Sequence, residues 1–293
     1  RMLEAGLLAV TILLSTGQNL LCKLFTMKYP GKSVDAASVY ALTTGLVTAV
    51  VSLSLNGFSI ACSRLTLILG IVNSVFGIIL DYSVVKISRS GPYSLQMLFI
   101  INGGILIPAI VARAFGDSYS VVKWISLVII IPAVYLACYN NRDSFTDKKT
   151  FFTFCVLGAL GNGGFLSMLD IQQRLTGEDE KAAMLAVSYL SIAAVSAVFL
   201  AATHRGKAWD AFRMPATPAV MLIAGAVILS AAINLKVYLL TVISSVLLYA
   251  FDNVGTLILS TGLSVVFFKD RITVPKIVGC GILSAALILV ATF

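Results

Sequence analysis

The polar side chains best suited to chemistry lie inside long apolar stretches of the chain. Within residues 245–267, Tyr249, Asp252 and Thr256 recur at intervals of three and four, so they share one face of a helix, and Asn253 borders that face. A carboxylate surrounded by hydrocarbon needs a cation, water or strong hydrogen-bond donors, and otherwise it takes up a proton. We therefore expect Asp252 to bind a solute or to couple a proton. The alternative is a buried acid that Tyr, Asn or Lys side chains hold for packing.

A second acid and several amides occupy similar positions in other apolar stretches. Asp81 is the second candidate for ion or proton coupling, and Asn73 lies on the same side of its helix. Polar side chains in a bilayer face either a cavity or a partner helix, so each can bind solute or hold helices together. The predicted solute-binding set consists of Gln18, Asn19, Asn73, Gln96, Asn102, Asn162, Asn234, Tyr238, Tyr249, Asp252 and Asn253.

Ten apolar stretches must position these side chains. The chain has 293 residues, of which 59% are hydrophobic and only 12% charged, and its mean hydropathy is +0.98, which excludes a soluble domain. Each stretch has about 20 residues, the length that crosses a hydrocarbon core of ~30 Å. The sequence therefore predicts an all-α integral membrane protein with ten transmembrane helices at 3–22, 36–55, 65–86, 92–112, 121–139, 150–170, 182–202, 217–236, 245–267 and 273–292.

The residues that other kinds of chemistry need are missing or scattered. The single histidine, His204, lies in a predicted loop, the five cysteines have no CxxC spacing, and no GxxxxGK[ST] motif is present. We therefore expect no catalytic residues, no metal and no cofactor, and we disfavour an integral membrane enzyme acting on a lipid-linked substrate. The basic residues behind the net charge of +8 lie between apolar stretches, which indicates lipid headgroups rather than nucleic acid as their partners.

The second half of the sequence repeats the first. A shift of 153 positions places Asp117 on Asp270, Ser120 on Thr273 and Lys123 on Lys276, and many apolar positions then match without a gap. We expect Thr273 to cap the helix that follows it. The duplication predicts a first five-helix repeat at 1–139, a polar linker at 140–149 and a second repeat at 150–293. Because each repeat has an odd number of helices, the second must cross the membrane in the opposite sense.

The repeated turn resembles that of the drug/metabolite transporter superfamily, in its ten-span EamA-like branch. Members end each half with a Gly-Glu-Arg-Leu-Thr turn, which here reads Lys-Asp-Arg-Ile-Thr at 269–273 and Gly-Asp-Ser-Tyr-Ser at 116–120. Both copies carry Asp in place of Glu, and the first lacks the Arg. The resemblance implies a solute carrier, often an exporter of amino acids or other metabolites, whereas some relatives exchange nucleotide sugars. We expect the turn itself to be structural, fixing how the helices on either side of it meet.

A secondary transporter is therefore the leading hypothesis. It would move a small polar or zwitterionic organic solute, such as an amino acid or another metabolite, by alternating access, with a proton or another ion as a possible coupling partner. The alternative is an exchanger of nucleotide sugars or phosphate esters, which needs several basic residues inside its cavity. Only Lys23, Lys86 and Lys236 come near, each at the end of a stretch, where a lysine ordinarily extends to the membrane surface.

The orientation in the membrane stays open at this stage. With the N-terminus inside, seven basic residues lie on inner segments and fourteen on outer segments, so the positive-inside rule places both termini outside. The family resemblance implies that both are cytoplasmic. We expect a multi-pass protein of the plasma (inner) membrane, surrounded by membrane lipids, that acts as a monomer or a homodimer.

Overall fold

The computed structural model describes residues 2–138, 145–176, 180–204, 207–243, 245–270 and 273–292. All regular structure in these residues is helical. The helices are α1 (Met2–Lys28), α2 (Ser33–Leu55), α3 (Arg64–Ser90), α4 (Tyr93–Ala114), α5 (Val121–Cys138), α6 (Lys148–Thr176), α7 (Lys181–Thr203), the short 3-10 helix η1 (Ala208–Phe212), α8 (Ala216–Leu239), α9 (Ser245–Phe268) and α10 (Val274–Thr292).

Eight of the described helices are long and apolar enough to cross a membrane, namely α1 to α4 and α6 to α9. The apolar runs within α5 and α10 are shorter, at Val121–Ala137 and Val274–Leu289. A helix of 27 residues, such as α3, is about 40 Å long at 1.5 Å per residue, which exceeds the ~30 Å of hydrocarbon. The chain is thus an all-helical protein with the composition of a multi-pass membrane protein.

Several helices expose a stripe of apolar side chains and bury polar side chains as well as apolar ones. On α3 the exposed stripe consists of Ile68, Ile71, Val72 and Val75, which recur at three- and four-residue intervals. Asn73 on the same helix is completely buried. This distribution suits a helix whose outer face contacts lipid, because lipid offers no partners to polar groups.

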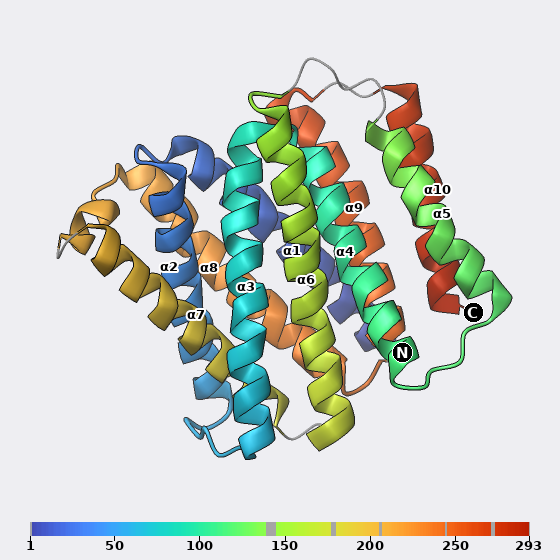
Figure 1. The fold of residues 1–293 in the computed structure, drawn as a ribbon, viewed down its shortest axis with the longest axis horizontal. Helices are drawn as coiled ribbons and strands as arrows, with labels where there is room; N and C mark the ends of the chain where they lie inside the picture. Colours follow the sequence, from blue (N-terminus) through green and yellow to red (C-terminus); the bar gives the residue numbers. More distant parts are fainter. Residues whose placement is uncertain are drawn as a thin grey trace.

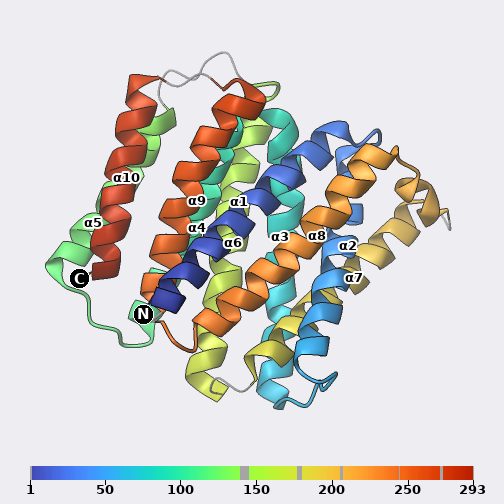
Figure 2. The same ribbon diagram turned by 180° about the vertical axis from the view of Figure 1, so that it is seen from behind.

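The helices pack mainly against helices that are distant in sequence. The closest pairs are α3 with α6, α2 with α7, α4 with α6, α5 with α10 and α1 with α8. Figure 1 shows that α1 begins and α10 ends at the same end of the molecule. Both views show α5 and α10 side by side at one edge, and Figure 2 shows α1 and α8 side by side on the opposite face from α3 and α6. The other eight helices form the body of the bundle.

Small residues allow the closest of these approaches. A Cβ atom added to Gly103 of α4 would lie 2.1 Å from the carbonyl oxygen of Ala159 on α6. The two backbones therefore touch at this point, as small residues permit in membrane helices. A larger side chain here would push α4 away from α6.

The two repeated turns lie at opposite ends of the bundle, where α4 ends and where α9 ends (Figure 1). Ser120 caps α5, because its hydroxyl accepts a hydrogen bond of 3.1 Å from the backbone N–H of Lys123. The expected counterpart is absent: the hydroxyl of Thr273 has no hydrogen-bond partner among the described residues. The prediction that Thr273 caps its helix is therefore wrong for this structure.

Candidate solute-binding cavity

A cavity with an empty volume of about 1000 Å³ lies inside the bundle. Residues from α1, α2, α3, α4, α6, α7, α8 and α9 line it, whereas α5 and α10 contribute none of the described lining.

An ion pair joins two helices across this cavity. Nζ of Lys236 on α8 lies 2.7 Å from Oδ2 of Asp252 on α9, and the two side chains are 18% and 5% exposed. Oδ1 of Asp252 accepts a longer hydrogen bond, 3.4 Å, from the hydroxyl of Ser15 on α1. Three helices thus meet at one carboxylate, and both of its oxygens have partners.

Asp81 is the second acid in the cavity lining, contributed by α3. No hydrogen bond or ion pair to Asp81 is found among the described residues, so its carboxylate has no cation of the protein beside it. The hydroxyls of Tyr40 and Tyr189 lie within electrostatic range of it. The helices that carry Asp81 and Asp252, α3 and α9, are not among the closely packed pairs of described helices, whereas α1 and α4 each pack against both.

Two further polar side chains in the lining have free hydrogen-bonding groups. Asn253 and Thr256 on α9 are 7% and 3% exposed. Neither Nδ2 of Asn253 nor Oγ1 of Thr256 has a hydrogen-bond partner within the described part of the chain. A buried amide N–H without a partner is costly, and a polar ligand in the cavity would supply the missing acceptor.

The structure brings together seven of the twelve residues predicted for binding or coupling. Helical spacing predicted that these residues share a face on each helix, and in the structure those faces line one cavity. They are Gln18, Asn19, Asp81, Asn162, Tyr249, Asp252 and Asn253. Two of them also hold the walls in place: Nε2 of Gln18 donates to the hydroxyl of Tyr40 at 2.5 Å, and Nδ2 of Asn162 donates to the carbonyl of Ile100 at 2.9 Å.

Two predicted binding residues join helices instead. Nδ2 of Asn73 donates to the hydroxyl of Ser188 on α7 at 3.2 Å, and Oδ1 of Asn234 accepts from Ser52 on α2 at 3.0 Å. Neither lines the cavity. Both serve the alternative role considered for buried amides, namely hydrogen bonding between membrane helices.

The remaining three predicted residues also lie away from the cavity lining. Gln96 accepts a hydrogen bond of 3.1 Å from Ser88, and Nδ2 of Asn102 donates to the carbonyl of Leu98 one turn earlier in its own helix. Tyr238 is 52% exposed near the end of α8. Each of these three side chains lies on a helix face that the sequence pattern does not distinguish from the face lining the cavity.

Lys236 is the residue that sequence reasoning missed. As a lysine near the end of a span, it was expected to extend to the membrane surface, whereas its ammonium group points into the cavity. The polar residues of α8, such as Asn234, predicted that a different face of this helix lines the cavity. Apart from Lys236, the face of α8 that lines the cavity is apolar. It consists of residues that recur at helical spacing, namely Leu229, Ala232, Ile233 and Lys236.

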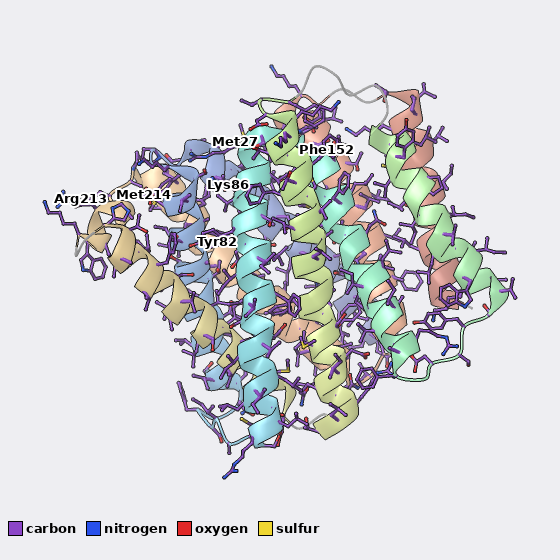
Figure 3. All side chains as sticks on the ribbon, in the orientation of Figure 1. Met27, Tyr82, Lys86, Phe152, Arg213 and Met214 are labelled. Carbon is purple, nitrogen blue, oxygen red and sulfur yellow. The ribbon has the colours of Figure 1, made fainter. Side chains whose placement is uncertain are left out.

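The other two lysines considered for the cavity do not line it. Lys23 is 3% exposed, and its Nζ donates to the carbonyl of Gly91 at 2.9 Å, beyond the end of α3. The same nitrogen lies 5.0 Å from the ring centre of Phe268, within range of a cation–π contact. Figure 3 labels Lys86 on α3, toward the end at which α4 begins. Lys236 is thus the one cation among the described residues of the lining.

The acids of the repeated turns make contacts outside their own turns. Asp117 accepts two hydrogen bonds, of 2.8 and 2.9 Å, from the guanidinium of Arg174 on α6, and these bonds hold the pKa of Asp117 below its usual range. Oδ2 of Asp270 accepts from the hydroxyl of Ser94, at the start of α4, at 3.2 Å. Each acid therefore ties its turn to a helix that is distant in the sequence, α6 for Asp117 and α4 for Asp270.

A second, mostly apolar pocket of about 510 Å³ lies between α4, α5, α6 and α9. Asp170 and Arg174 lie on its lining, at the end of α6 where Asp117 binds. Tyr249, which is 8% exposed, lines both this pocket and the central cavity. Its side chain therefore belongs to the wall between the two spaces.

Comparison with known proteins finds matches among solved structures only. No family model and no curated protein matches the chain. Among the solved structures that match, one described only as "Crystal structure of protein" is 13% identical, covers 96% of this chain and of its own, and superposes with a TM-score of 0.60. At this identity the likeness extends to the fold alone.

Proposed function

We propose that the protein is a secondary transporter that moves a small polar or zwitterionic organic solute through the membrane by alternating access. The observation that carries the proposal is the Lys236–Asp252 ion pair inside a closed set of eight helices. Charged side chains inside a membrane protein are costly, and they are found where a substrate or ion passes. Free polar groups of Asn253 and Thr256 in the same lining support this reading.

The packing of the helices supports two inverted five-helix halves, at 1–139 and 150–293 with a linker at 140–149. If α1 to α5 are exchanged with α6 to α10, the pair α3–α6 becomes α8–α1, and α3–α7 becomes α8–α2, and all four pairs occur. The pairs α2–α7, α4–α9 and α5–α10 exchange into themselves. Such a pattern is expected of ten spans related by a two-fold axis in the membrane plane, a common plan of transporters. The resemblance to the EamA-like branch of the drug/metabolite transporters is part of this proposal.

The charges of the cavity favour this function over exchange of nucleotide sugars or phosphate esters. A polyanionic solute needs an excess of cations around it. Among the described residues of the lining, the cation Lys236 is already paired with Asp252, and Asp81 adds a second acid. A solute with several negative charges would therefore meet more repulsion than attraction.

Reconstitution tests the proposal directly. The purified protein in liposomes is offered radiolabelled amino acids, amines, nucleosides and sugar phosphates, after a thermal-unfolding screen has selected those that stabilise it. We expect at least one amino acid or amine to enter saturably, and Asp252→Asn to abolish that flux. Asp210→Asn, which alters an exposed acid within η1, is the matched control. Ligands that stabilise the protein without ever crossing the membrane, or flux that survives Asp252→Asn, would contradict the proposal.

A further inference from the structure

The charges lining the cavity are those that complement a solute with two cationic groups and one carboxylate. We infer that the transported solute is a dibasic amino acid or a close analogue, with a net charge of +1. This inference rests on the proposed transport function and deepens it by naming the substrate class. The described lining holds two acids, Asp81 and Asp252, and one cation, Lys236, which is paired with Asp252, so Asp81 has no cation of the lining beside it.

The α-amino and α-carboxylate groups of an amino acid match the ion pair on α8 and α9. Lys236 and Asp252 bind each other in the empty cavity, so each is preset to bind the opposite charge of a zwitterion. A carboxylate that replaces Asp252 beside Lys236 also meets the free N–H of Asn253. An ammonium group that replaces Lys236 beside Asp252 joins the hydroxyl of Ser15 there. All charges stay paired during this exchange, which avoids the cost of an isolated buried ion.

Asp81 provides the place for a second cation. It lies on α3, which is not among the described helices that pack closely against α9, so a second cationic group at a distance from the first would reach it. The rings of Tyr40 and Tyr189 line the cavity near it, and aromatic rings attract organic cations. A side-chain guanidinium or ammonium group, several bonds away from the α-amino group, would supply the missing positive charge. A neutral zwitterion would leave Asp81 buried without a partner, which disfavours its binding.

Two pairs of closely matched ligands test the inference on the full chain. L-Citrulline has the shape of L-arginine without the side-chain charge, and agmatine is arginine without the carboxylate. We expect arginine to compete for transport and to stabilise the protein at concentrations at least about tenfold lower than either analogue, a difference of ~1.4 kcal/mol. Asp81→Asn should remove the preference for arginine over citrulline, and Asp81→Glu should keep it. Lys236→Met should remove the preference for arginine over agmatine, and Asp210→Asn should leave both preferences unchanged.

The results separate this inference from the proposed function. Saturable flux of neutral amino acids with no preference for arginine would overturn the inference and leave the transporter proposal standing. The same holds for a preference for arginine over citrulline that persists in Asp81→Asn. If no solute crosses the membrane, both fail. Should Asp81→Asn not fold, the ratio of arginine to citrulline binding in the wild type decides, since equal binding contradicts a second cation site.

Discussion

Replacing Lys236 by Met should destabilise the protein, because Asp252 then stays buried without its cation. At 2.7 Å the pair attracts by about 6 kcal/mol with an effective dielectric constant of 20, and the cost of burying both charges cancels much of this. Breaking one partner of a buried pair costs about 3–5 kcal/mol. We expect about 2–4 kcal/mol for Lys236→Met, because Ser15 still donates to Asp252. Asp252→Asn should cost less, because the flexible lysine stem can turn toward the nearby end of α8.

The double variant should recover much of the lost stability, since it leaves no buried charge. The coupling energy of the double-mutant cycle, about 2 kcal/mol or more, measures the ion pair itself. In thermal unfolding of the detergent-solubilised protein, 1 kcal/mol corresponds to about 2 °C at this chain length, so Lys236→Met should melt about 4–8 °C lower. The control cycle uses Asp210→Asn and Arg213→Met, an exposed pair 3.3 Å apart, for which we expect no resolvable coupling. Additive losses at Lys236 and Asp252 would refute the ion pair as described.

Three other sets of variants test separate parts of the structure. Asp117→Asn should lower the melting temperature slightly between pH 8 and 5, because the pKa of Asp117 is depressed in the folded state. The difference in melting temperature from wild type should vanish as the pH falls below the ordinary carboxyl pKa, ~3.9. A difference that grows in acid would contradict the contact with Arg174. Gly103→Ala should destabilise by about 1–3 kcal/mol, because its Cβ meets Ala159, whereas Gly262→Ala, with open space around it, is the control that should not. Asn234→Ala should cost about 1 kcal/mol in stability and leave the KM of transport unchanged, whereas Asn253→Ala should raise KM, and the reverse pattern would exchange their assigned roles.

The helices could be predicted because hydrophobicity reports directly on the membrane, although it does not report where a helix ends. The fourth span was expected at 92–112, and α4 runs from Tyr93 to Ala114. The first and sixth were expected to end at 22 and 170, but α1 continues to Lys28 and α6 to Thr176. Both extensions contain charged residues and are still helical, and the α6 extension carries Arg174, which binds Asp117. A hydropathy pattern marks the edge of the lipid, while backbone hydrogen bonds carry the helix past it.

The cavity could be predicted only in part, because a polar face on a helix has two possible neighbours. Asp252 and Asn253 line the cavity as expected, since an acid has few alternatives inside a bilayer. Asn73 and Asn234 had the same appearance in the sequence but contact other helices. Lys236 was missed because its position depends on which face of α8 turns inward, a property of the assembled bundle. Packing between helices decides this, and no single helix encodes it.

The packing of early helices against later ones has a consequence for how the chain is made. The helices α1, α2 and α3 leave the ribosome and enter the membrane before their main partners, α8, α7 and α6, have been synthesised. During that interval Asp81 and Asn73 are in the bilayer without the helices that later enclose them. We therefore expect α1 to α3 to stay at the insertion machinery, where water reaches them, until α6 is inserted. Alternatively, α3 stays near the membrane surface during this interval. Biosynthesis of this protein thus has a vulnerable stage between its third and sixth helices, when truncation or stalling leaves a polar helix in lipid.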